Sequence, residues 1–95
     1  MTNLLPGYRV GQAHDARVKT GVTVIFPDVP ATASVDVRGG GPGTREISAL
    51  QDGGLIEQVH AIVLAGGSVY GLGAADAVTT WLGAQGIGYA PGPAP

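Results

Sequence analysis

The amino-acid sequence predicts a mixed α/β (α+β) fold, arranged as a single partial domain over residues 1–95. Short apolar runs rich in β-branched residues, each bounded by Gly or Pro, are typical of strands. One later run has apolar residues at helical spacing, which indicates a helix. The chain has 17 glycines and 7 prolines, but they lie between the periodic runs, and 44% of the residues are hydrophobic. We therefore expect a folded chain with a modest core.

Four segments are predicted to be strands, near residues 8–11, 22–26, 33–37 and 60–65. The first follows the turn signal Pro6-Gly7. The second consists of β-branched and aromatic residues and stops at Pro27, so it is the clearest strand by propensity. The third alternates with period two, with Val35 and Val37 on one face. We expect the second and third to pair as a hairpin.

The segments between these strands are predicted to be loops and short helical turns. Residues 12–19 are polar and are expected to form a loop. Thr44 is in position to cap a short helix over residues 45–50. Residues 55–59 offer one more helical turn, and residues 87–89 have the composition of the beginning of another strand.

The stretch from His60 to Trp81 is the centre of the chain's organisation. It predicts a strand, a Gly66-Gly67 turn and a helix near residues 68–83. Ser68 is the expected N-cap, because its hydroxyl can accept from N–H groups of the first helical turn. One side of the helix carries only Gly and Ala, and each glycine costs up to ~1 kcal/mol relative to alanine. That cost predicts close packing of this side against another backbone segment.

Composition excludes several classes of partner. A formal net charge of −2 with five scattered Lys and Arg residues gives no basic patch for nucleic acid. The absence of cysteine excludes disulfides and thiolate metal sites, and it fits a cytoplasmic protein. The N-terminus lacks a secretory pattern, and no apolar run approaches the ~20 residues of a membrane span. We expect a cytoplasmic protein with neither a nucleic-acid nor a membrane partner, and no cofactor.

The turn after the fourth strand is the candidate substrate-binding site. It fails the nucleophile motif Gly-x-Ser-x-Gly because Tyr70 stands at the last glycine, and a serine at such a place is more commonly a helix cap. No Gly-Lys-Ser/Thr follows, as a phosphate loop requires, and Asp76 replaces the third glycine of a dinucleotide fingerprint. What remains is a turn whose free N–H groups can bind an anion or oxyanion. Gly66, Gly67, Ser68 and Tyr70 are therefore the substrate-binding candidates, and no catalytic residue is assigned.

The histidines and large aromatic residues are expected to be structural. His14 and His60 lie far apart, and no carboxylate stands at ligand spacing from them, so no metal site is predicted. Trp81 and Tyr70 are interpreted as packing residues. Tyr70 is also close enough to the turn to line a pocket.

Residues 39–44 form a glycine-rich loop, in which regular secondary structure would have a high entropic cost. Glycines allow such a loop to adopt positive φ or to bring its backbone close to another group. We expect Arg38 or Arg45 to fix the loop by pairing with Asp36 or Glu46. Recognition of a substrate carboxylate by one of these arginines is the alternative.

Two long stretches of the chain, Val35 to Glu46 and His60 to Leu72, resemble a known family. Shorter matches lie at Gly21 to Ile25, Ala74 to Val78 and Gly86 to Gly88. In order and spacing they are similar to the opening part of the self-processing aminopeptidases. That family includes L-aminopeptidase/D-esterases, β-peptidyl aminopeptidases and nylon-oligomer endo-hydrolases.

The resemblance implies the N-terminal part of a four-layer α/β/β/α sandwich and a peptidase or amidohydrolase activity. Family members are made as precursors that cut themselves before a Ser or Thr, whose freed α-amino group then acts as base for its own hydroxyl. No position in this chain matches the cleavage site, so the nucleophile is expected beyond Pro95 and residues 1–95 alone should be inactive. The implied partners are a peptide or small amide substrate, the remainder of the same precursor chain, and further copies in a homo-oligomer.

Two other interpretations stay open at the level of the sequence. The chain could be a small stand-alone anion-binding or assembly module without catalysis, which would use its glycine loop and helix start. It could also be a truncated relic with unpaired sheet edges that recruit other chains. The Pro-rich end at residues 90–95, which has no cap or polar tail, favours a piece of a larger protein.

Overall fold

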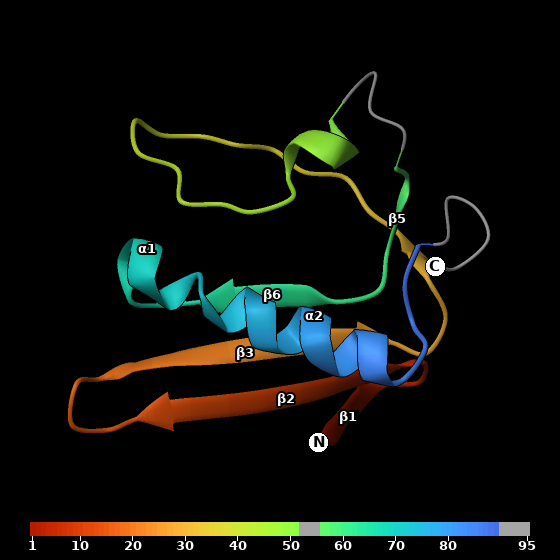
Figure 1. Cartoon of the computed structure of the whole chain (residues 1–95), viewed down its shortest axis with the longest axis horizontal. Helices are drawn as coiled ribbons and strands as arrows, with labels where there is room; N and C mark the ends of the chain where they lie inside the picture. The colour runs from red at the N-terminus through yellow and green to blue at the C-terminus, as the bar shows by residue number, and fades with distance from the viewer. Residues whose placement is uncertain (52–55, 90–95) are drawn as a thin grey trace.

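A computed structural model describes residues 1–51 and 56–89 of the chain. Its main element is a four-stranded antiparallel sheet in the order β1-β2-β3-β6, and a two-stranded sheet pairs β4 with β5. Figure 1 shows α2 lying across one face of the main sheet, with the loop that follows β4 running above β6. The predicted mixture of strands and helix is therefore confirmed.

The first three strands form a continuous meander. β1 (Thr2–Leu5) turns at Pro6-Gly7 into β2 (Tyr8–Asp15), which pairs along its whole length with β3 (Thr20–Pro27). The predicted strands at 8–11 and 22–26 are confirmed. The loop predicted over 12–19 is wrong at residues 12–15, where β2 continues to Asp15, and is confirmed at residues 16–19, which form the turn between β2 and β3. Pairing with β3 satisfies the backbone of residues 12–15, which outweighs their weak strand propensity. In the turn between β2 and β3, Asp15 Oδ1 accepts a hydrogen bond from the Arg17 N–H at 2.8 Å, which stabilises the turn.

β6 (Ile62–Ala65) lies at the edge of the sheet and pairs with β3, from Val22 opposite Ala65 to Ile25 opposite Ile62. The strand predicted at 60–65 is thus confirmed at residues 62–65. A bend at His60 separates it from β5 (Gln58–Val59).

The strand predicted at 33–37 is wrong. Only β4 (Ala31–Thr32) pairs, and its partner is β5. One further hydrogen bond runs from the Ala33 N–H to the Glu57 carbonyl oxygen at 3.1 Å. The expected hairpin with residues 22–26 cannot form, because β2 and β6 already occupy both edges of β3. Period-two alternation shows that a segment can be extended, but a ladder also requires a free partner edge.

The helix predicted over 68–83 is divided into α1 (Ser68–Gly71) and α2 (Ala74–Ala84). The break at Leu72-Gly73 is closed by a bond from the Gly73 N–H to the Tyr70 carbonyl oxygen at 3.2 Å. Glycines on both sides of Leu72 lower the helix propensity of this segment, which explains why the break occurs there.

The predicted end of the helix near Gly83 to Gly86 is confirmed. Gly86 has a φ of 72°, and its N–H donates to the Gly83 carbonyl oxygen at 3.0 Å. The Ile87 N–H donates to the Leu82 carbonyl oxygen, also at 3.0 Å. These two bonds form a Schellman motif, in which a glycine with positive φ satisfies the last carbonyl groups of a helix.

Three further local predictions fail or are only partly covered. Residues 45–50 contain only a short 3-10 helix, η1 (Ser48–Leu50), whose N-cap is Ile47 and not Thr44. The helical turn predicted at 55–59 is wrong at Gln58–Val59, which is β5, whereas residue 55 lies outside the described residues. Residues 87–89 are not a strand. The Pro-rich end at 90–95 also lies outside the described part of the chain.

The core lies between the sheet and α2. Val24 and Phe26 of β3 are buried there, and the Phe26 ring stands 5.2 Å from the ring of Trp81 at an interplanar angle of 56°. The packing role predicted for Trp81 is confirmed. No helix within residues 1–51 and 56–89 has both the length and the apolar character to cross a membrane.

The opposite face of the sheet is apolar and uncovered by the described residues. The register places Ile62 and Leu64 on the side away from Val24 and Phe26, and their exposed fractions are 43% and 57%. Leu5 and Tyr8 extend this face across the sheet and are also exposed. The sheet therefore has one covered face and one open apolar face.

Candidate functional site

The candidate site is the turn Gly66-Gly67 between β6 and α1. The Gly66 N–H donates to the Gly21 carbonyl oxygen at 2.9 Å, so the turn starts directly from the backbone of β3. Gly67 has a φ of 90°, which residues with a side chain rarely adopt. The helical bonds of α1 then begin with the Gly71 N–H, which donates to the Gly67 carbonyl oxygen at 3.0 Å.

The turn packs tightly on both of its sides. A Cβ atom on Gly71 would overlap the carbonyl oxygen of Gly66, and one on Gly66 would lie 2.8 Å from Thr20 Oγ1. The glycine-lined helix makes a close approach to backbone at Gly71, and the segment approached is the turn that precedes the helix. Packing of its Gly and Ala side against a separate backbone segment stays a prediction.

Ser68 does not cap the helix, so that prediction is wrong. The N-cap is Gly67, and no side chain makes a capping hydrogen bond there. Ser68 is the first residue of α1 and has a φ of 60°, a left-handed conformation that costs a residue with a side chain roughly 1–2 kcal/mol. Strained residues of this kind cluster at functional sites, where the surrounding structure holds them in place. The strain supports the choice of Ser68 as a site residue, for a different reason than capping.

Tyr70 is the most exposed large side chain of the site. Its exposed fraction is 92%, and the neighbouring Val69 is also exposed, so the packing role predicted for Tyr70 is wrong within the described chain. Gly66, Gly67 and Ser68 are exposed as well. The fold therefore brings all four predicted residues together on one accessible turn.

Two exposed ion pairs flank the glycine-rich loop, and the sequence predicted one of them. Arg38 Nε lies 2.7 Å from Asp36 Oδ2, as expected, whereas Arg45 Nη1 lies 2.7 Å from Asp76 Oδ1 at the start of α2. Pairing of Arg45 with Glu46 is therefore not what fixes the loop. The pair with Asp76 connects the loop to α2, next to the break between α1 and α2. Gly43 of the loop also lies close to the Leu72 side chain at this break.

Among the described residues, no group of three or more His, Cys, Asp and Glu side chains is close enough to hold a metal ion. His14 lies on β2, opposite Gly21, and His60 lies at the bend before β6.

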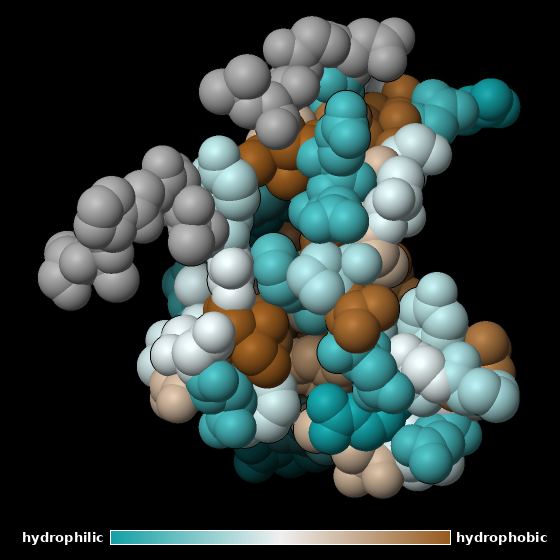
Figure 2. Space-filling view, turned by 90° about the vertical axis from the view of Figure 1, so that its right-hand side faces the viewer, coloured by the Kyte–Doolittle hydropathy of each residue, from teal (hydrophilic) through white to brown (hydrophobic). Residues whose placement is uncertain are grey.

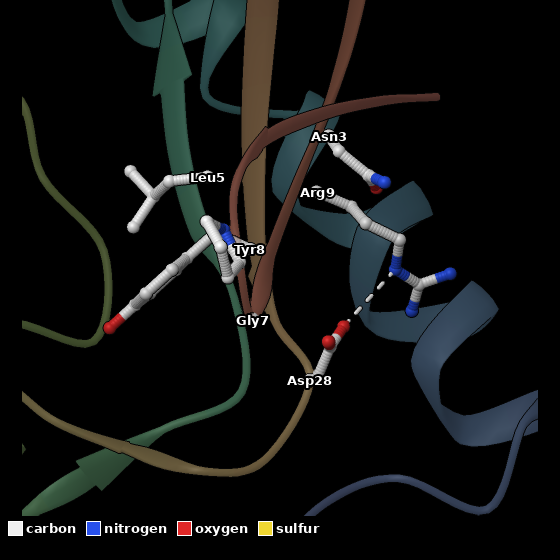
Figure 3. Close-up of a pocket in the computed structure, with 7 residues that line it drawn as sticks. Asn3, Leu5, Gly7, Tyr8, Arg9 and Asp28 are labelled. Carbon is white, nitrogen blue, oxygen red and sulfur yellow. Dashed lines mark ion pairs between the residues drawn. The ribbon is translucent and has the colours of Figure 1, made fainter.

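Two surface depressions lie away from the turn. The first, of about 290 Å³, surrounds the β1–β2 turn and contains an ion pair in which Arg9 Nε lies 3.5 Å from Asp28 Oδ1. Figure 3 shows Leu5 and Tyr8 pointing to one side of the sheet and Arg9 to the other. The depression therefore wraps around the end of the hairpin and is not an enclosed cavity.

The second depression, of about 260 Å³, lies at the end of α2 and includes His60 and Trp81. On the side of the molecule seen in Figure 2, hydrophobic residues form separate groups between hydrophilic ones. Neither depression is lined by the four predicted site residues. In the described chain the turn is an open surface.

Comparison with known proteins places the chain in a class of peptidases. It matches the model of peptidase family S58 over residues 4–92 and belongs to that family. An uncharacterised aminopeptidase of Mycobacterium tuberculosis (strain ATCC 25618 / H37Rv) is 52% identical over 62 residues, which cover 65% of this chain and 18% of the relative. An uncharacterised aminopeptidase of Mycobacterium leprae (strain TN) is 43% identical over 86 residues, with coverages of 82% and 24%.

A 6-aminohexanoate-oligomer endohydrolase of Kocuria sp. (strain KY2) is 42% identical over 74 residues, which cover 78% of this chain and 19% of the relative. The chain thus spans about a fifth to a quarter of the length of these curated relatives. The resemblance to self-processing aminopeptidases is confirmed at the level of the family.

Sequence reasoning missed two residues at this site. Thr20, whose hydroxyl lies against the turn, is far from Gly66 along the chain, and no local pattern connects them. In the sequence, Asp76 only excludes a dinucleotide fingerprint, whereas in the structure its carboxylate is the partner of Arg45. Both contacts depend on tertiary structure.

Proposed function

We propose that this chain supplies the N-terminal part of a self-processing peptidase or amidohydrolase, which cleaves an aminoacyl amide or a linear amide oligomer. The observation that carries the proposal is the family match over residues 4–92. The names of the relatives, aminopeptidase and 6-aminohexanoate-oligomer endohydrolase, both describe cleavage of amide bonds. Family membership favours this function over a stand-alone anion-binding or assembly module.

In the proposed mechanism, a Ser or Thr freed by self-cleavage attacks the amide carbonyl. Its own α-amino group takes the hydroxyl proton, so nucleophile and base belong to one residue. That residue lies in another part of the precursor. The described chain contributes the binding surface and not the attacking group.

We place the substrate at Gly66, Gly67, Ser68 and Tyr70. Glycine lets a bound amide approach the backbone closely, and N–H groups in the first turn of a helix have no partner inside that helix. Such N–H groups can donate to a carbonyl oxygen that gains negative charge during attack. Because α1 has only four residues, the helix dipole contributes little, and the proposal depends on these individual donors. The exposed Tyr70 hydroxyl supplies a further donor beside them.

The open sheet face supports the proposed four-layer α/β/β/α sandwich. In such an arrangement a second sheet covers the apolar residues that α2 leaves exposed, including Ile62 and Leu64. The remainder of the precursor is the proposed source of that sheet. Assembly of processed pairs into a homo-oligomer and a cytoplasmic location belong to the same proposal, and the lack of cysteine supports the location.

The proposal is tested by the intact mass of the natural protein, isolated together with any co-purifying chain and assayed on chromogenic amino-acid amides and on linear amide oligomers. We expect two chains, one that begins with this sequence and one that begins with Ser or Thr, and turnover of at least one substrate type. Purified residues 1–95 serve as the control and should give no turnover above a blank. A single species that consists of residues 1–95, or turnover by that species, would contradict the proposal.

A further inference from the structure

Thr20, the first residue of β3, carries a buried hydroxyl that lacks a hydrogen-bond partner among the described residues. Folded proteins leave few such groups unsatisfied, because a buried hydroxyl without a partner loses the hydrogen bonds that water gave it. The missing partner of Thr20 Oγ1 therefore calls for a physical explanation.

The hydroxyl lies directly against the proposed substrate-binding turn. Thr20 Oγ1 is the atom nearest to the position that a Cβ would take on Gly66, at 2.8 Å, and it is 3.4 Å from the corresponding position on Gly67. The neighbouring Gly21 carbonyl oxygen is already bonded to the Gly66 N–H. The Thr20 hydroxyl is thus a polar side-chain group of β3 that lies against the turn without a hydrogen bond among the described residues.

We infer that Thr20 is a positioning residue for substrate binding. When a substrate amide occupies the turn, the Thr20 hydroxyl hydrogen-bonds the Gly66-Gly67 backbone and holds the turn's N–H groups toward the substrate. A hydroxyl can rotate to donate or accept, so a small shift of the turn is sufficient to form this bond. The Thr20 oxygen acts through the turn and does not touch the substrate, because that atom is buried. This inference rests on the proposed function.

A hydrogen bond that forms only with bound substrate has a distinctive consequence. It lowers the free energy of the bound and reacting states but not that of the unliganded protein, so its loss reduces kcat/KM without reducing stability. A typical net hydrogen bond corresponds to a factor of about 3 to 10 in an equilibrium or rate constant.

The test uses Thr20→Val and Thr20→Ser in the full-length, processed protein. Valine keeps the shape and removes the hydroxyl, whereas serine keeps the hydroxyl and removes the methyl group. We expect Thr20→Val to lower kcat/KM for an aminoacyl amide or amide oligomer by about 3- to 10-fold, while Tm stays equal or rises. Thr20→Ser should keep most of the activity. Thr23→Val is the matched control, because the Thr23 hydroxyl on the same strand accepts from Gln12 Nε2 and not from the turn.

Three results would overturn the inference while leaving the proposed function intact. The first is a wild-type kcat/KM in Thr20→Val. The second is a parallel loss of Tm and activity in that variant, which would indicate a structural hydrogen bond present at all times. The third is an equal loss in Thr20→Ser and Thr20→Val, which would assign the effect to the methyl group. A wild-type protein inactive on both substrate types would instead overturn the proposed function, and the inference with it.

Discussion

The contact between Gly71 and the Gly66 carbonyl oxygen gives the sharpest prediction about the turn. In Gly71→Ala the new methyl group would occupy the space of that oxygen, so the backbone of the turn must move. Gly83→Ala is the matched control, because its Cβ would meet no atom within 4 Å and its position lies within α2. The two variants make the same chemical change in helical segments of the same chain.

The expected magnitudes follow from these two environments. Gly83→Ala should stabilise the protein by about 0.5–1 kcal/mol, because alanine has the higher helix propensity. At Gly71, overpacking costs about 1–3 kcal/mol. Displacement of the turn also threatens the bond from the Gly66 N–H to Gly21, worth about 1 kcal/mol. We therefore expect the two variants to differ by about 2–4 kcal/mol.

The assay is urea unfolding of both variants in the full-length protein, together with kcat/KM on an aminoacyl amide or amide oligomer. Gly71→Ala should also lose at least about tenfold in kcat/KM, because small displacements of substrate-binding groups are costly. Gly83→Ala should keep wild-type kinetics. Equal stabilities of the two variants would refute the close contact. A destabilised Gly71→Ala with wild-type kinetics would refute the placement of substrate at the turn.

Two further predictions concern the packing and the ion pairs. Trp81→Ala should destabilise the protein by about 2–3 kcal/mol. This value is below the range for fully buried aromatic residues, because Trp81 is 38% exposed. Trp81→Phe should retain most of the contact with Phe26. The free energy of unfolding of both variants is measured by urea unfolding followed by far-UV circular dichroism. A double-mutant cycle with Arg45→Met and Asp76→Asn should give a coupling below about 1 kcal/mol that decreases at high salt, because the two side chains are 41% and 79% exposed.

Each of these predictions has a definite contrary result. A change below about 0.5 kcal/mol in Trp81→Ala would mean that α2 is held by other contacts, since surface substitutions typically fall in that range. A coupling between Arg45 and Asp76 well above about 1 kcal/mol, unaffected by salt, would mean that the pair is buried in the full-length protein.

Local sequence patterns correctly predicted the elements whose formation depends on the propensities of neighbouring residues. The run of β-branched and aromatic residues before Pro27 became the central strand, and the glycines after Leu82 ended α2 with a Schellman motif. Residues 12–15 and 33–37 show the limit of such patterns. The first segment became a strand because β3 offered a partner edge, and the second did not because no such edge was free.

The site was located by sequence but its geometry was not. Two glycines after an apolar run marked the turn, and the surrounding motif carried the family resemblance. The break before α2, the positive φ of Ser68 and the exposure of Tyr70 were all missed. Helical spacing cannot detect a break that depends on how glycines at the start of a helix pack against the preceding turn.

The family, the mixed fold class and the position of the turn could be predicted from the order of residues, because propensity, hydrophobic periodicity and motifs are properties of neighbouring residues. The pairing of the strands, the pairing of Arg45 with Asp76 and the position of the Thr20 hydroxyl against Gly66 are visible in the folded chain alone. These contacts join residues far apart in the chain. Their energies depend on distance in space, which no local pattern of residues encodes.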